Sequence, residues 1–182
     1  MGAARSPALL AGVVLALCAC GVAGRAAAED YLGRGQFLAE AFAGSAPVAR
    51  TLWLTAAMKE DAQRVLGAAP AALRVRYWQA GERTAWILDE IGKEQPITLG
   101  VVVEQGRIER VRVMAFRESR GWEIRHDFFT AQYRGLGLAA DGALSREVDG
   151  ITGATLSVRA VNRAARLALW LAARQEAGLA AH

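Results

Sequence analysis

A polar turn near the C-terminal end of the chain leads directly into a long helical pattern. Residues 149–157 read DGITGATLS and combine two glycines, three hydroxyl side chains and an aspartate. The first backbone N–H groups of a helix have no partner within it, and the helix dipole is positive at that end, so both favour an anion. The glycines permit a tight backbone turn. The small side chain of Ala154 would leave the hydroxyl of Thr155 accessible. The turn is therefore either an N-cap made by Thr152 or Thr155, or a seat for a phosphate group.

Two widespread nucleotide-binding patterns are excluded at this turn. A Walker loop needs a Gly-Lys-Ser/Thr sequence, and none follows here. The dinucleotide fingerprint needs a different glycine spacing after a parallel βαβ unit, and the preceding sequence does not provide one. An anion at this turn would therefore be bound in another way.

The residue inventory excludes several classes of cofactor and partner. Cys18 and Cys20 are the two cysteines, and both lie in an N-terminal apolar segment. The domain that follows has no thiol for a disulfide, an iron–sulfur cluster, a thiolate zinc site or haem attachment. Two histidines are too few for a histidine metal site, so no metal is expected, and His126 is interpreted as a surface or capping residue. The 22 basic and 18 acidic residues give no electrostatic footprint for nucleic acid.

Residues 1–28 have the composition of an export signal. Arg5 precedes an unbroken apolar run of about 17 residues, and an Ala-Ala-Ala site follows. A membrane anchor needs about 20 apolar residues, so an export signal fits the run better. The sequence LCAC also resembles a bacterial lipobox, which would make Cys20 a lipidated residue and which competes with cleavage after Ala28. We therefore expect an exported protein, periplasmic or extracytoplasmic, either free or lipid-anchored to a membrane.

Residues 29–182 have the pattern of one α+β domain without repeats or linkers. Helical patterns occupy 35–42 and 56–67, and paired segments of alternating apolar residues follow at 72–91 and 96–116. These segments predict an antiparallel sheet of about four or more strands with one face on a core. Short N-terminal helices and a long C-terminal helix would pack with this sheet.

The long C-terminal helix is predicted over 156–177. Its sheet-facing side carries small apolar residues, namely Val158, Val161, Ala165, Ala168 and Ala172. The other side carries an arginine stripe, namely Arg159, Arg163, Arg166 and Arg174. The stripe is interpreted as a solvated face or as a docking face, with Trp170 packed under guanidinium groups or turned towards a partner. Phe128, Phe129 and Tyr133, at near-helical spacing before the turn, are expected in the core.

The ordered stretch 149–157 resembles the Asp-x-x-(Ser/Thr)-Gly-Ala-Thr-x-(Ser/Thr) signature of the FMN-binding domain family. The match covers every fixed position of that signature, and the wider resemblance is concentrated in residues 96–169. The family includes the FMN-carrying subunits of the sodium-pumping NADH:quinone reductase and of the ion-translocating ferredoxin:NAD oxidoreductase. The resemblance implies that residues 29–182 form an FMN-binding domain.

The resemblance also implies that FMN is bound covalently, through its phosphate, to the hydroxyl of Thr155. An FAD:protein FMN transferase would form this bond after export, using Mg²⁺ and releasing AMP, and would recognise the surrounding motif. The other motif residues assigned to cofactor binding are Asp149, Thr152, Gly153, Ala154, Leu156 and Ser157.

A second segment, RESRGW at 117–122, lies where the ion-pumping subunits carry Glu-Thr-Pro-Gly beside the flavin. The residues assigned to the flavin from this segment are Glu118, Ser119, Arg120, Gly121 and Trp122. Arg120 replaces the proline, and it either favours the reduced anionic flavin or makes a surface salt bridge. Trp122 either covers a face of the ring or anchors the core.

These features together predict an exported flavoprotein that relays electrons between membrane or extracytoplasmic redox partners, with a membrane reductase as the expected electron source. An electron-transfer protein fits better than a self-contained enzyme, because the sequence presents no acid–base pair or substrate cleft. Two alternatives stay open. One is a flavin-dependent reductase of a small acceptor such as a ferric chelate or a quinone, and the other is a binding lipoprotein without flavin in which the turn is only a cap.

Overall fold

The computed structural model describes residues 29–180. The expected export signal, including Cys20, therefore lies outside the described residues. Within 29–180 no helix combines the length and the apolar character needed to cross a membrane.

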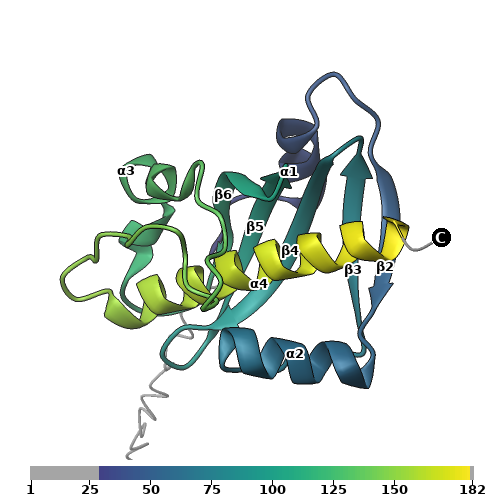
Figure 1. Cartoon of the computed structure of the whole chain (residues 1–182). Helices are drawn as coiled ribbons and strands as arrows, with labels where there is room; N and C mark the ends of the chain where they lie inside the picture. Colours follow the sequence, from purple (N-terminus) through teal and green to yellow (C-terminus); the bar gives the residue numbers. More distant parts are fainter. Residues whose placement is uncertain (1–28, 181–182) are drawn as a thin grey trace, which may run out of the picture.

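One antiparallel sheet of six strands forms the centre of the molecule (Figure 1), in the order β1-β6-β5-β4-β3-β2. The strands are β1 Glu29–Asp30, β2 Val48–Trp53, β3 Arg74–Ala80, β4 Arg83–Ile91, β5 Pro96–Glu104 and β6 Arg107–Phe116. The predicted α+β class and antiparallel sheet are confirmed, and strands β3 to β6 coincide with the two predicted pairs of alternating segments. In the predicted turn between β5 and β6, Gln105 and Gly106 have φ angles of 50° and 69°, as tight hairpin turns require.

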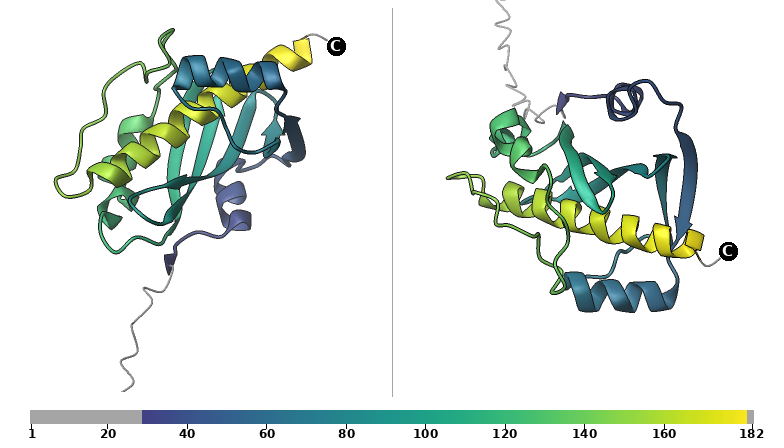
Figure 2. Two further views of the ribbon diagram at one scale, coloured as in Figure 1. Left: turned by 90° about the horizontal axis from the view of Figure 1, so that it is seen from below. Right: turned by 45° about the horizontal axis from the view of Figure 1, so that its top comes forward.

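Two helices cover one face of the sheet and a third covers the other. The helix α4 (Thr155–Ala180) crosses the sheet diagonally, and α2 (Ala56–Leu66) lies beside it (Figure 2). The helix α1 (Arg34–Ala41) packs on the opposite face, where the ring of Phe37 leaves no room for a side chain at Gly100. The domain is therefore layered as helices, sheet and helix.

The main core lies between α4 and the sheet. The predicted packing face of α4 is confirmed, because Val158, Val161, Ala165, Ala168 and Ala172 are all buried. Small side chains let the helix approach the strands closely, and larger rings fill the sheet side of the core. Trp86 is fully buried there and stacks on Tyr77 with 4.7 Å between ring centroids.

A short helical segment connects β6 to the loop before α4. It contains η1 (Trp122–Arg125), α3 (Asp127–Thr130) and η2 (Ala131–Tyr133). The prediction that Phe129 and Tyr133 belong to the core is confirmed, since both are fully buried. The prediction for Phe128 is wrong, because its side chain is 64% exposed. Neighbouring residues of one helical turn point in different directions, so only one of the two phenylalanines faces the sheet.

Three of the four arginines in the stripe on α4 donate to acceptors within the domain, so the stripe is not purely a solvated face, and the docking-face interpretation stays a prediction. Arg163 donates to Glu90 and to the carbonyl of Ile91, and Arg166 donates to the carbonyls of Gly142 and Leu66. At the far end both Arg174 and the buried Trp170 donate to the carboxylate of Asp61 on α2.

Most of the stripe therefore contacts α2, the end of β4 and the loop before α4. Trp170 packs beneath the guanidinium of Arg174, whose carbon lies 5.3 Å from the ring centroid. Arg159, nearest the start of the helix, is the member of the stripe that stays exposed without a partner among the described residues.

Candidate functional site

The polar turn 149–157 delivers Thr155 to the first position of α4. The N–H of Ala154 donates to the carbonyl of Ile151 at 3.0 Å, and the carbonyl of Ala154 accepts the first helical hydrogen bond from Val158 at 2.9 Å. Gly153 has a φ of 84°, a left-handed conformation that glycine adopts without strain. Ala154 is buried beneath the turn, whereas Thr155 is exposed. The hydroxyl of Thr155 is therefore presented at the mouth of a 26-residue helix.

The hydroxyl groups at this helix start are not used as caps. Among the described residues, neither Thr152 nor Thr155 accepts a hydrogen bond from a backbone N–H of the first turn. The first-turn N–H groups of residues 155–157 precede the helical hydrogen-bond ladder and have no partner within it. The plain N-cap interpretation consequently has no support in the geometry, and the anion-binding interpretation keeps its donors.

The second predicted segment folds onto this helix start from more than thirty residues away in the sequence. Gly121 has a φ of 89°, and a Cβ atom built on it would collide with the Oγ of Ser157 and lie 3.4 Å from the Cβ of Ala154. Only a glycine allows this approach of the loop to α4. The sequence assigned both segments to one cofactor, and the structure brings them into contact.

A cavity of about 320 Å³ lies between the two segments. Its lining residues are Lys93, Glu118, Ser119, Arg120, Gly153, Ala154, Thr155, Leu156 and Ser157. All of these except Lys93 are residues that the sequence assigned to cofactor binding. The volume lies at the lower end of the range of small-molecule sites, about 300–1,000 Å³.

Glu118 fixes one wall of this cavity. Its Oε1 accepts backbone hydrogen bonds from Lys93 at 2.5 Å, Glu94 at 2.6 Å and Gln95 at 2.8 Å, which belong to the turn between β4 and β5. Gly92 makes room for this carboxylate, since a Cβ there would lie 2.8 Å from Oε1. The carboxylate therefore ties the 117–122 segment to the turn and carries Lys93 to the edge of the cavity.

The three N–H donors also determine the ionisation of Glu118. Burial taken alone would raise the pKa of this carboxyl, but the hydrogen bonds from Gln95, Glu94 and Lys93, with the charge of Lys93, hold the pKa below its usual value of 4.5. Because the pKa of Glu118 is lower in the folded than in the unfolded protein, its ionised carboxylate contributes fully to stability at a pH above its unfolded pKa. This contribution is lost as the pH falls through the lower folded value.

We therefore expect the turn at 93–95 to respond to acid through Glu118. In the wild-type protein the three amide proton chemical shifts should titrate together by NMR, with one shared midpoint below pH 4.5. In Glu118→Gln, which keeps the acceptor oxygen without the charge, this shared titration should disappear. A wild-type midpoint at or above 4.5, or an unchanged titration in the variant, would contradict the assignment.

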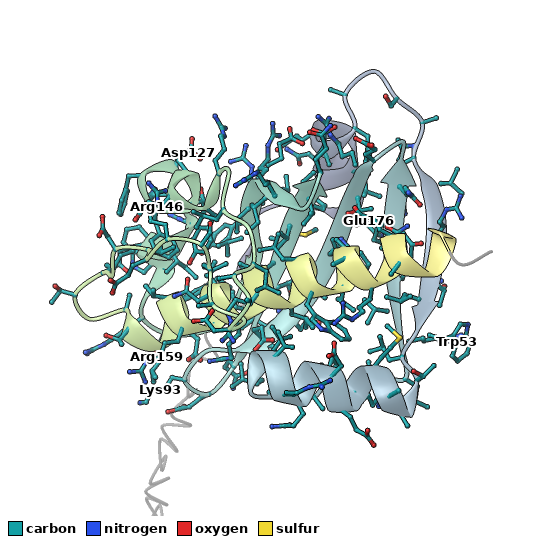
Figure 3. All side chains as sticks on the ribbon, in the orientation of Figure 1. Trp53, Lys93, Asp127, Arg146, Arg159 and Glu176 are labelled. Atoms are coloured by element: carbon teal, nitrogen blue, oxygen red, sulfur yellow. The ribbon has the colours of Figure 1, made fainter. Side chains whose placement is uncertain are left out.

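Lys93 is the lining residue that sequence reasoning missed. It lies in a tight turn after β4, with its ammonium 3.1 Å from the carboxylate of Glu94 and both side chains about 70% exposed. Nothing local distinguishes this lysine from any charged turn residue, because its position depends on the long-range contact made by Glu118. Figure 3 shows Lys93 below the first turns of α4.

Four of the predicted site residues do not line the cavity, namely Gly121, Asp149, Thr152 and Trp122. Asp149 and Thr152 are exposed in the turn that leads to the helix, and the backbone N–H of Asp149 donates to the side chain of Gln132 at 2.8 Å. Trp122 does not line the cavity, and its side chain is 43% exposed, so it is not a core anchor either.

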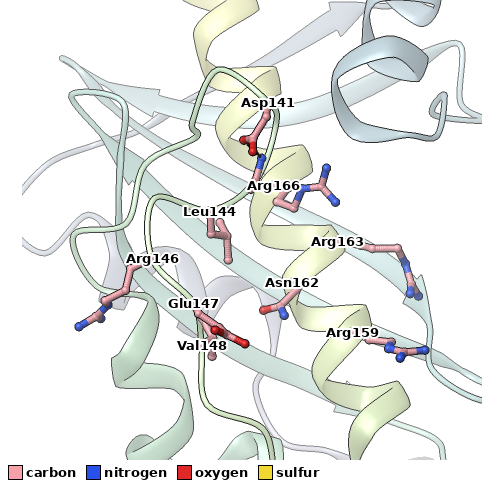
Figure 4. Close-up of a pocket in the computed structure, with 10 residues that line it drawn as sticks. Asp141, Leu144, Arg146, Glu147, Val148, Arg159, Asn162, Arg163 and Arg166 are labelled. Atoms are coloured by element: carbon pink, nitrogen blue, oxygen red, sulfur yellow. Dashed lines mark hydrogen bonds between the residues drawn. The ribbon is translucent and has the colours of Figure 1, made fainter.

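A larger hollow of about 620 Å³ lies along the next turns of α4, between the helix and the loop 141–148 (Figure 4). Its arginines do not converge on a common point. Arg146 and Arg159 point away on opposite sides in the close-up, and Arg166 is held by backbone carbonyls. In the described residues no cluster of three or more histidine, cysteine, aspartate or glutamate side chains is arranged to hold a metal ion.

The smaller cavity has the groups that a flavin phosphate needs. Unpartnered N–H groups at the start of α4 and the dipole of a long helix favour a phosphate, and Lys93 and Arg120 add positive charge. Leu156 is 42% exposed and offers an apolar surface beside these groups. The residues present therefore fit an anionic group with an apolar ring attached.

Comparison with known proteins agrees with this arrangement. The model of the FMN-binding domain family matches residues 92–170, from the turn that Glu118 holds to the middle of α4. A search among curated proteins finds no match to the chain. Both walls of the cavity lie within the matched residues.

Proposed function

We propose that this chain, whose residues 92–170 match the FMN-binding domain family, is an exported flavoprotein that carries FMN covalently on Thr155 and relays electrons. The observation that supports this most is the exposed hydroxyl of Thr155 on the wall of the 320 Å³ cavity. The hydroxyl lies at the N-terminus of α4, which favours a phosphate, and the 117–122 segment forms the opposite wall of the cavity.

The attachment chemistry follows from the position of Thr155. Its Oγ1 would attack the FMN phosphorus of FAD, the bond to the AMP phosphate would break, AMP would leave, and the hydroxyl proton would be lost. This step belongs to an FAD:protein FMN transferase, because the described residues near Thr155 include no acidic cluster to hold the required Mg²⁺. Asp149 and Thr152 are exposed beside the acceptor, where such an enzyme can read them.

The residues of the cavity would then hold the phosphodiester. The N–H groups at 155–157 lie at the positive end of the α4 dipole, which stabilises a negative charge by about 0.3–1 kcal/mol at an exposed site. Lys93 and Arg120 stand on the opposite wall. Covalent attachment suits an exported protein, since a dissociable cofactor would be lost outside the cytoplasm.

Electron transfer requires little further chemistry from the protein. When bound, the flavin accepts two electrons and releases them singly, and the chain supplies its position and charge environment. We propose the flavin as the redox centre of the protein and a membrane reductase as its electron source.

The relay function is distinguished from the reductase alternative by turnover. Flavinylated protein should be reoxidised once by ferric citrate or a soluble quinone after chemical reduction, and should show no sustained consumption of NADH with either acceptor. Absorbance of the oxidised flavin and of NADH would be followed together under anaerobic conditions. Many turnovers per protein molecule would instead favour a reductase acting on a small acceptor.

A further inference from the structure

A group of exposed aromatic side chains lies beside the 320 Å³ cavity, and these side chains do not pack into the hydrophobic core. The side chains of Trp122 and Phe128 are 43% and 64% exposed, whereas eight of the other aromatic side chains of the described residues are buried. His126 lies between them and is also exposed. Solvating these rings is unfavourable, and exposed apolar patches of this kind mark interaction surfaces.

The rings and one guanidinium form a continuous set of contacts. The ring of Trp122 meets His126 edge to face at 5.3 Å, and His126 stacks on Phe128 at 6.0 Å between centroids. The guanidinium of Arg125 lies 4.9 Å from the Trp122 ring and 4.6 Å from the ring of Tyr31. We call these five side chains the aromatic face. Mutual contacts hold the side chains in place before any partner binds, which lowers the entropic cost of binding.

The aromatic face borders the flavin cavity directly. Gly121, which precedes Trp122, is pressed against Ala154 and Ser157 at the start of α4. Ser119 and Arg120 of the same segment line the cavity, and the exposed Leu156 lies on its other wall. Whatever covers the aromatic face therefore comes close to the cofactor site.

The N-terminal part of the chain enters the domain at the same place. Strand β1 pairs Glu29 with Phe116, at the end of β6 where the 117–122 segment begins, and Tyr31 follows two residues later. Figure 2 shows β1 next to the short helical segment that contains α3. The apolar run at 8–24 therefore ends only a few residues before Tyr31, the first member of the aromatic face in the sequence.

We propose that the aromatic face lies against the surface of a lipid bilayer and holds the flavin cavity at the membrane. Tryptophan and tyrosine are enriched at the headgroup level, where one end of the ring is apolar and the other is wet. If Cys20 bears a lipid, the chain between it and Glu29 spans at most about 30 Å, which keeps this face near the bilayer.

The charges around the face are compatible with this occupant. The carboxylate of Asp127 is 87% exposed but pairs with Arg112 at 3.2 Å, and Glu123 is partly buried. The proposal does not depend on flavin attachment, since neither Thr155 nor any phosphate takes part in it. A failure of the covalent linkage would therefore leave it standing, and the reverse holds too.

Quenching of tryptophan fluorescence by brominated lipids tests the proposal. The full chain, purified from an exporting host with the N-terminus that maturation leaves, would be mixed with vesicles of phosphatidylethanolamine and phosphatidylglycerol. Half of the samples would use lipids brominated near the top of the acyl chain. The ratio between brominated and plain vesicles cancels any effect of the flavin on fluorescence.

Two matched substitutions identify the tryptophan whose fluorescence the brominated lipids quench. Trp122→Phe keeps an aromatic ring in the face and removes the reporter, so lipid quenching should be lost. Trp53→Phe removes a tryptophan that is 62% exposed on β2, at the opposite edge of the sheet, so quenching should persist. Wild-type protein that shows no quenching, or Trp122→Phe that is quenched as strongly as the wild type, overturns the proposal. The first of these results would favour a protein partner for the face.

Discussion

Thr155→Ala is expected to abolish covalent flavin loading completely when the protein is co-expressed with a flavin transferase. The wild-type protein should fluoresce in a denaturing gel and gain the mass of one FMN minus water. The alanine variant should do neither, because it lacks the exposed hydroxyl that Thr155 places on the cavity wall at the start of α4. Its fold should be unaffected, since exposed surface substitutions usually change stability by about 0.5 kcal/mol or less.

Thr155→Ser provides the matched control. It retains a hydroxyl at the same helix position, so it should still accept FMN, at a rate set by the transferase. Thermal unfolding of all three proteins would show that they fold alike. A flavin adduct retained in Thr155→Ala would remove the acceptor assignment, and loss of the adduct in a well-folded Thr155→Ser would show that the methyl group matters as much as the hydroxyl.

Gly121→Ala is expected to have the second largest effect, on both stability and flavin loading. Alanine at a φ of 89° is strained by about 1–2 kcal/mol. The added Cβ would also collide with the Oγ of Ser157, which costs roughly 1–3 kcal/mol more through overpacking. Relief requires the 117–122 segment to move away from α4, and that movement opens the cavity. Denaturant unfolding and the fraction of protein loaded with flavin would measure the two consequences.

Gly135→Ala separates strain from crowding. Gly135 has a φ of 78°, but no atom lies within 4 Å of the position that an added Cβ would take, so only the backbone strain applies. The variant should lose about 1–2 kcal/mol and load flavin normally. The double variant Gly121→Ala/Ser157→Ala should recover part of the loss, since the nearest atom is removed. Equal losses in Gly121→Ala and Gly135→Ala would mean that the loop does not need its close approach to α4.

The elements with strong periodicity were predictable from the sequence. The strands β3 to β6 alternate apolar and polar residues because one face of the sheet packs on α4. The strand β2 was missed, since nearly all of its side chains are exposed and no alternation results. The two-residue β1 is too short to give any pattern.

The surface partners of α4 were not predictable. A row of arginines on a helix predicts a solvated face when no neighbour is known. Here α2, the end of β4 and the loop before α4 supply the acceptors, among them Asp61, Glu90 and the carbonyl of Gly142, which are distant in the sequence. Tertiary contacts of this kind leave no local signal.

The residues of the candidate site also divide into those that the sequence predicted and those that it did not. The motif at 149–157 pointed to a helix start with an exposed hydroxyl, and the loop at 117–122 pointed to the opposite wall. Lys93 and the bonding of Glu118 to the turn at 93–95 depend on a contact spanning more than twenty residues, which only the fold reveals.

Peptide mapping of the wild-type protein tests the central claim most directly. After co-expression with a flavin transferase, trypsin should release the peptide 147–159, which contains three hydroxyl residues, Thr152, Thr155 and Ser157. Fragmentation by tandem mass spectrometry should place the FMN phosphodiester on Thr155 alone. An adduct on either of the other two residues, or an unmodified peptide from fully processed protein, would contradict covalent flavin attachment at the start of α4.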